Sequence, residues 1–166
     1  MSVRIFLLAA ATLVFQRILG LPGLPAWASE ILLPMVLIVG STMRSKERRW
    51  PFDALLLGLF WDLLLEPVVG PGGIAWTATS LCLMAMGGFV ADRSAKSWAV
   101  FGAVGALVLT TVYHVTLVPL GLASSLTLSS LLRTAALTGL WSGLVGVVLA
   151  LDLPKQWRAY RVRKLR

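Results

Sequence analysis

The sequence is poor in the residue types that build metal centres and covalent cross-links. Its 166 residues include one cysteine, one histidine and no asparagine. Cys82 has no partner for an internal disulfide and lies in an apolar run, where we expect it to act as a small apolar side chain. Because there is neither a second histidine nor a cysteine pair, the sequence predicts no metal site and no cofactor.

Motifs of common enzymes are missing as well. The sequence contains neither a phosphate-binding P-loop nor an H-E-x-x-H zinc motif. Four serines lie in one connector, but no obvious base accompanies them, as nucleophilic catalysis would require; they are Ser124, Ser125, Ser129 and Ser130. We therefore expect a protein that is not an enzyme.

Long apolar runs dominate what is present. The hydrophobic content is 58% and the mean hydropathy +0.86, whereas soluble domains are about 45–50% apolar. A membrane-spanning helix needs about 20 residues, and the sequence predicts an all-α bundle of six such helices in residues 1–153, followed by a tail at 154–166. The expected spans are 3–19, 26–43, 51–65, 74–91, 98–118 and 131–153. Pro34 is expected to kink the second span, and 66–73 to form an irregular connector.

The basic residues follow a pattern that predicts topology. All Lys and Arg residues except Arg17 and Arg133 lie in four places, namely Arg4, 44–49, 93–96 and 155–166. The other polar connectors, 20–29, 66–72 and 119–130, contain none. Cytoplasmic loops of membrane proteins carry this excess of positive charge. The net charge of +8 is thus interpreted as a topology signal rather than as a nucleic-acid footprint, which predicts a multi-pass membrane protein with both termini cytoplasmic.

The N-terminal segment also resembles a secretory signal. Arg4, an apolar run and the small residues around Trp27 match its three regions. Gln16 and Arg17 interrupt the run, and cleavage would leave an odd number of spans. We expect the segment to be retained as a helix.

The C-terminal tail combines aromatic and basic side chains. This pattern predicts an interfacial helix that binds anionic lipid headgroups, and binding of a cytoplasmic protein is the alternative. The expected headgroup ligands are Lys155, Arg158, Arg161, Arg163, Lys164 and Arg166.

Five polar side chains fall inside the expected spans, all toward the extracytoplasmic side: Arg17, Asp62, Glu66, His114 and Arg133. Charges at this depth are costly and need a reason. The first hypothesis is an internal network in which the arginines neutralise the acids, with Asp62 paired most directly to Arg17. The second is an outward-open polar pocket that binds a small solute or a peptide.

A stripe of small residues marks the last span. Ala135, Gly139 and Gly143 recur every four residues, and such residues allow helices to approach closely in lipid. The stripe is either a partner-binding face or a packing surface within the bundle, and in a scaffold protein we expect it to be the partner-binding face.

One central motif carries a family resemblance. The segment Gly58-Leu-Phe-Trp-Asp62-Leu-Leu, followed by Gly70-Pro-Gly-Gly-Ile-Ala75, resembles the MreD family of bacterial rod shape-determining membrane proteins. Chain length and span number are also similar to that family. The residues that match the motif are Gly58, Asp62 and Gly70.

The resemblance implies a non-enzymatic membrane scaffold of the cell-elongation machinery that helps to organise peptidoglycan synthesis. Its implied partners are a single-span periplasmic protein like MreC and, more distantly, MreB and the RodA–transpeptidase pair. It further implies a fold similar to the substrate-binding subunits of energy-coupling factor transporters. The alternative function is therefore such a subunit in vitamin uptake, although the sequence lacks asparagine and an evident aromatic and amide pocket.

Overall fold

The computed structural model describes residues 3–23, 25–44, 50–66, 68–87, 94–122 and 126–150, which form helices without any β-strand. The elements are α1 (Val3–Leu19), α2 (Ala26–Ser29), α3 (Met35–Arg44), α4 (Trp50–Leu65), α5 (Pro71–Gly87), α6 (Ala95–Leu117), the 3-10 helix η1 (Val118–Leu120) and α7 (Leu128–Ala150). The predicted all-α architecture is confirmed for these ranges.

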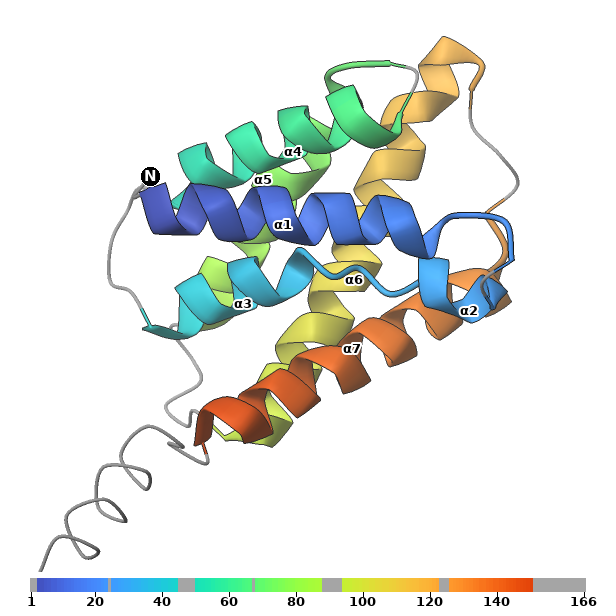
Figure 1. Ribbon diagram of the computed structural model, residues 1–166. Coiled ribbons are helices and arrows are strands. Elements are labelled where there is room, and N and C mark those ends of the chain that lie inside the picture. The colour runs from blue at the N-terminus through green and yellow to red at the C-terminus, as the bar shows by residue number, and fades with distance from the viewer. Residues whose placement is uncertain are drawn as a thin grey trace, which may run out of the picture.

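Successive long helices run in alternating directions (Figure 1). The starts of α1, α4 and α6 lie on the left of the view, together with the ends of α3, α5 and α7. The right side carries α2, the end of α1 and the turn from α6 to α7. The helix ends that border the basic segments of the sequence therefore share one end of the bundle.

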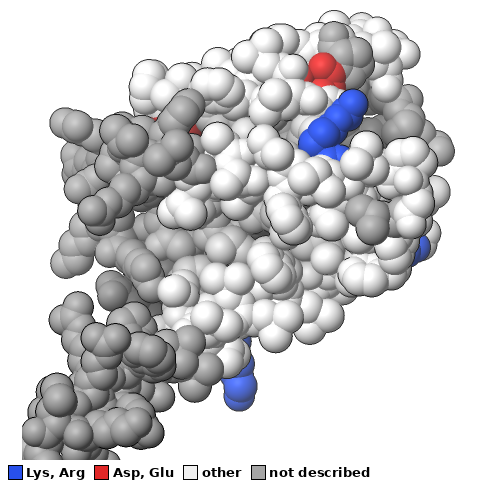
Figure 2. Space-filling model, viewed as in Figure 1, with Lys and Arg blue, Asp and Glu red and all other residues white. Residues whose placement is uncertain are grey.

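Polarity is distributed with apolar groups outward and polar groups inward. The described part of the face in Figure 2 carries few charged side chains, and large apolar side chains are exposed on the long helices, among them Phe15, Phe52, Leu81, Val100 and Leu140. Buried polar residues include Gln16, Ser41, Asp62, Thr79, Ser80, Thr138 and Ser142. Two helical stretches, Ala95–Leu120 and Leu128–Ala150, are long and apolar enough to cross a membrane.

Hydroxyl caps start the last two long helices earlier than predicted. The Ser94 hydroxyl accepts a hydrogen bond from the Ser97 N–H at 3.4 Å, and the Thr127 hydroxyl accepts one from the Ser130 N–H at 3.3 Å. These side chains satisfy N–H groups of the first turn that have no partner within the helix. The predicted starts at 98 and 131 were therefore three residues late, since α6 begins at Ala95 and α7 at Leu128.

The prediction of one continuous helix over 26–43 is wrong. The short α2 ends at Ser29 and α3 starts at Met35. Pro34 lacks an N–H, its ring clashes with the carbonyl four residues earlier, and it disfavours helical geometry at Leu33. Five residues of irregular backbone result, instead of the expected kink.

The connector between α4 and α5 is also shorter than predicted. Pro71, Gly72 and Gly73 belong to the first turn of α5 rather than to the irregular segment 66–73. Proline fits the first position of a helix because its missing N–H would have had no partner there. The end predicted at 91 lies outside the described residues, as does the end predicted at 153.

The core is built mainly by α3, α5 and α6, and α1, α4 and α7 add a few buried side chains to it. Its largest fully buried side chains include Trp76 of α5, Phe101 of α6 and Met35 of α3. The helices α6 and α7 pack along most of their length, whereas α1 touches α4 only over a small area. The helices α4 to α7 are thus tightly packed on one another, whereas α1 is more loosely attached to α4.

Candidate functional site

The buried carboxylate of Asp62 is the centre of the motif singled out from the sequence. Asp62 lies in the last turn of α4 and is fully buried. One carboxylate oxygen accepts a hydrogen bond from the Gly70 N–H at 2.7 Å, and the Gly72 N–H donates to both oxygens at 2.9 and 3.0 Å. The side chain therefore ties the end of α4 to the start of α5.

The α5 N-terminus compensates the charge of Asp62. The first N–H groups of a helix lack partners within it and carry a partial positive charge. Pro71 has no N–H, so the carboxylate meets the two donors on either side of it, those of Gly70 and Gly72. Gly70 has a φ of +128°, a backbone conformation that glycine adopts without strain.

Glycines bring the two helices into backbone contact beside this carboxylate. A Cβ atom added to Gly58 would lie 2.7 Å from the Gly73 Cα, and one added to Gly72 would lie 2.8 Å from the Gly58 carbonyl oxygen. Any larger side chain at Gly58 or Gly72 would push the helices apart. Further along, Trp61 packs on Trp76 with ring centroids 5.7 Å apart. The motif is thus a single packing unit, which we call the Asp62 latch (58–62 with 70–73).

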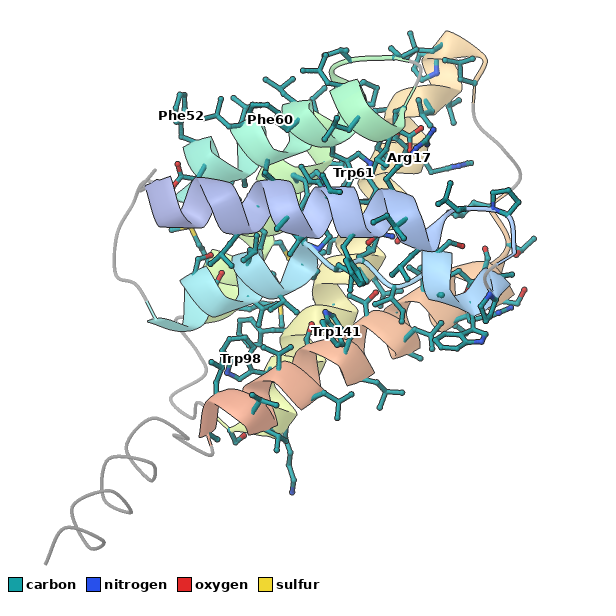
Figure 3. All side chains as sticks on the ribbon, viewed as in Figure 1. Arg17, Phe52, Phe60, Trp61, Trp98 and Trp141 are labelled. Carbon is teal, nitrogen blue, oxygen red and sulfur yellow. The ribbon has the colours of Figure 1, made fainter. Side chains whose placement is uncertain are left out.

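The predicted pairing of Asp62 with Arg17 is wrong. The Asp62 carboxylate is occupied by backbone N–H groups, and the Arg17 side chain is exposed. Figure 3 shows Arg17 on the side of α1 that faces the end of α4. Across the described ranges Arg17 makes no ion pair. Sequence reasoning assumed that a buried acid needs a basic side chain, whereas a helix N-terminus serves here.

The two arginines do not neutralise Asp62 and Glu66 as predicted. Arg133 forms an ion pair with Glu30, with its Nε 2.9 Å from a carboxylate oxygen, whereas the negative charges of Glu66 and Asp62 both act on the Tyr113 hydroxyl group. His114 is partly buried next to Tyr113. The predicted single network is therefore wrong, because within the described ranges neither arginine pairs with Asp62 or Glu66.

Sequence reasoning missed the two side chains that hold the break between α2 and α3. The Gln16 amide donates to the Ser29 carbonyl at 3.1 Å and accepts from the Leu33 N–H at 3.0 Å. The Thr138 hydroxyl accepts from the Leu32 N–H at 3.1 Å. Both side chains are buried. The available signal was Gln16 itself, a polar residue in an apolar helix.

The small-residue stripe of α7 is a packing surface within the bundle. A Cβ added to Gly139 would lie 3.0 Å from the Ala103 Cβ, and one added to Gly143 would lie 3.0 Å from the Ala99 Cβ. Ala135 is buried on the same helix. The partner-binding alternative for this stripe is therefore wrong, because α6 already occupies it.

The remaining sequence predictions concern the basic tail, metal ligands and Cys82. The basic tail at 154–166, with its expected headgroup ligands, lies outside the described residues. Within the described ranges, no three histidine, cysteine, aspartate or glutamate side chains gather as metal ligands would. Cys82 is a free, partly buried thiol on α5.

Comparisons with protein-family models, with curated proteins and with solved structures find no match for this chain.

Proposed function

We propose that the protein crosses the bacterial inner membrane six times, with α2 and α3 together forming one crossing and both termini in the cytoplasm. The observation that carries this proposal is the combination of an apolar exterior with polar groups turned inward. Water would penalise such an exterior, whereas lipid favours it and demands that backbone groups be satisfied internally. The alternating helix directions (Figure 1) give further support, because they place the helix ends that border the basic segments of the sequence at one end of the bundle.

We further propose that the protein is a non-enzymatic scaffold of the cell-elongation machinery, as its resemblance to the MreD family implies. The residues that carry this resemblance, Gly58, Asp62 and Gly70, act together in the Asp62 latch, which supports a structural origin for the motif. The partners proposed on this basis are an MreC-like single-span periplasmic protein and, through it, MreB and the RodA–transpeptidase pair.

Affinity purification tests the scaffold function. The full chain, tagged at one terminus, is extracted in mild detergent, and the proteins that co-purify are identified by mass spectrometry. A tagged multi-pass protein of unrelated function serves as the control. We expect enrichment of a single-span protein with a large periplasmic region, whereas enrichment of ATPase subunits would contradict the scaffold and support a transporter.

The substrate-binding subunit of a vitamin transporter is the second candidate, and the break between α2 and α3 favours it. Transporters often build solute sites from interrupted helices. In this chain, however, Gln16 and Thr138 satisfy backbone groups of the break, which weakens the case. A ligand that binds the native state raises its melting temperature, so a transporter subunit should respond to its vitamin and a scaffold should not.

A further inference from the structure

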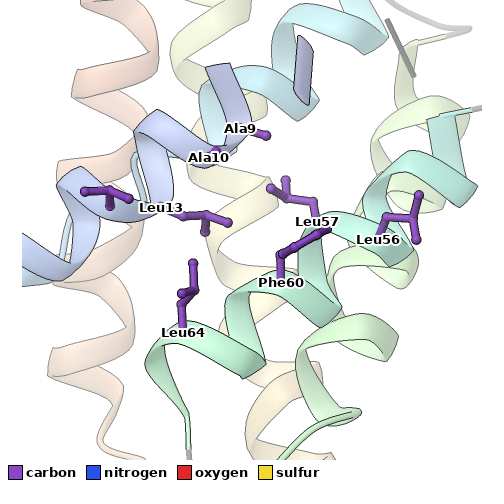
Figure 4. A pocket seen from close by; sticks show the side chains of 8 residues that line it. Ala9, Ala10, Leu13, Leu56, Leu57, Phe60 and Leu64 are labelled. Atoms are coloured by element: carbon purple, nitrogen blue, oxygen red, sulfur yellow. The ribbon is translucent and has the colours of Figure 1, made fainter. Parts of the chain in front are cut away.

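An apolar groove separates α1 from α4. Its volume is about 260 Å³, and Figure 4 shows side chains of the two helices on its opposite sides. The lining residues are Ala9, Ala10, Leu13 and Val14 of α1 and Leu56, Leu57, Phe60 and Leu64 of α4. The two alanines leave space on the α1 side that larger side chains would fill.

A cationic side chain lies beyond the outer end of this groove. Arg17 follows Leu13 by four residues, which places it on the same face of α1 one turn further along. The Arg17 side chain is exposed and, in the part of the chain that the structure describes, has no acidic partner. An apolar trough thus ends at a free guanidinium group.

We propose that this groove binds one acyl chain of an anionic phospholipid, with the lipid phosphate at Arg17. The lining favours an acyl chain, because all eight lining side chains are apolar and offer no hydrogen-bond partner. The lining of α4 spans Leu56 to Leu64, about 12 Å at roughly 1.5 Å per residue. The charge favours an anion, because guanidinium groups bind phosphate through charge-assisted hydrogen bonds.

The inference rests on the proposed membrane location and is independent of the elongation function. Membrane extraction is therefore checked first. A chain that purifies without detergent removes the membrane proposal, whereas a chain that needs detergent and binds no lipid removes this inference alone.

Native mass spectrometry of the detergent-purified full chain, titrated with phosphatidylglycerol, measures the binding. We expect Ala10→Phe to fill the groove and reduce affinity at least tenfold. Ala11→Phe is the matched control, since Ala11 is exposed on the same helix and does not line the groove. Arg17→Gln should weaken binding about fivefold, the effect of one basic residue near an anionic lipid. Arg133→Gln, which removes the arginine paired with Glu30, should leave binding unchanged.

A second pair of variants covers the case in which Ala10→Phe fails to fold. Val14→Trp fills the groove from an exposed position, and Phe15→Trp, also exposed but outside the lining, is its control. We expect only Val14→Trp to lose binding. The proposal would be overturned if each groove variant bound the lipid as tightly as its control variant. Binding of inorganic phosphate with the affinity of the lipid would also overturn it. Cross-linking of a cysteine at Leu64 to a second protein helix, on a Cys82→Ala background, would assign the groove to a protein instead.

Discussion

The helix α4 has two neighbours that it meets in opposite ways. Toward α5 it offers Gly58 and Asp62, and the two backbones touch. Toward α1 it offers leucines and Phe60, and a groove remains between the helices. Within one helix, a face of glycine and a buried acid fixes a single arrangement, whereas a face of large apolar side chains tolerates several.

The difference indicates where the protein is rigid and where it can adapt. Hydrogen bonds from a buried carboxylate to backbone N–H groups have one geometry, so the Asp62 latch sets the angle between α4 and α5. Apolar contacts are not directional, so α1 can shift as the groove fills or empties. We therefore expect substitutions in the latch to be costly and equivalent ones along the groove to be mild.

The largest loss of stability is expected when Gly72 is substituted. In Gly72→Ala the new methyl group would overlap the Gly58 carbonyl and the Asp62 carboxylate, and we expect a loss of about 3 kcal/mol in the free energy of unfolding. Gly73→Ala is the matched control, because its methyl group meets only the flexible ends of Leu55 and Leu59. Denaturation in detergent measures both. Similar losses for the two variants would contradict backbone contact at Gly72.

The second-largest loss of stability is expected when the charge on Asp62 is removed. Asp62→Asn weakens the bonds from Gly70 and Gly72 and places an amide NH2 group near backbone donors, at a cost of about 2 kcal/mol. Because Arg17 is not its partner, the effects of Asp62→Asn and Arg17→Gln should add. Unfolding curves of the two single variants and the double variant test this. If the double variant lost clearly less stability than the sum of the two single losses, Asp62 and Arg17 would be in contact, as expected from the sequence.

Substitutions at the break between α2 and α3 test a tightly packed region that lies away from the Asp62 latch. Thr138→Val conserves shape but leaves the buried Leu32 N–H without its acceptor, at a cost of about 1–3 kcal/mol. Thr79→Val is the control, because the equally buried Thr79 hydroxyl donates only to the Ala75 carbonyl of its own helix. Its loss should be smaller. Comparison of the two melting temperatures decides whether Thr138 supports the break.

The smallest effects are expected along the groove. Leu64→Ala removes a half-exposed side chain that borders the groove, and we expect a change within about 0.5 kcal/mol. A loss as large as that of Gly72→Ala, measured in the same detergent, would mean that α1 and α4 are as tightly joined as α4 and α5.

Much of the helix layout could be predicted from the sequence, because apolar runs and breaking residues are local signals. The start and end of α1 were predicted correctly at Val3 and Leu19. The break at 30–34 was not foreseen. Proline alone predicts a kink, and the full interruption depends on Gln16 and Thr138, which are distant in the sequence.

The candidate site was located by the sequence but its bonding was not. The motif residues Gly58, Asp62 and Gly70 do lie together, yet Asp62 bonds to backbone rather than to Arg17. Side-chain types reveal possible ion pairs, whereas the positions of backbone N–H groups depend on the path of the chain. The sequence also could not show what the glycines of α7 contact, because small residues serve contacts within the bundle and contacts with a partner equally well.

The proposed topology is tested most directly by labelling single cysteines in intact cells with a reagent that cannot cross the membrane. The Cys82→Ala background removes the native thiol. A cysteine at Ser125, in the connector without basic residues, should be labelled from outside, whereas cysteines at Ser45 and Ser94, beside the basic segments, should react only after the membrane is permeabilised. Labelling of Ser45 and Ser94 but not Ser125 in intact cells would contradict the proposed orientation.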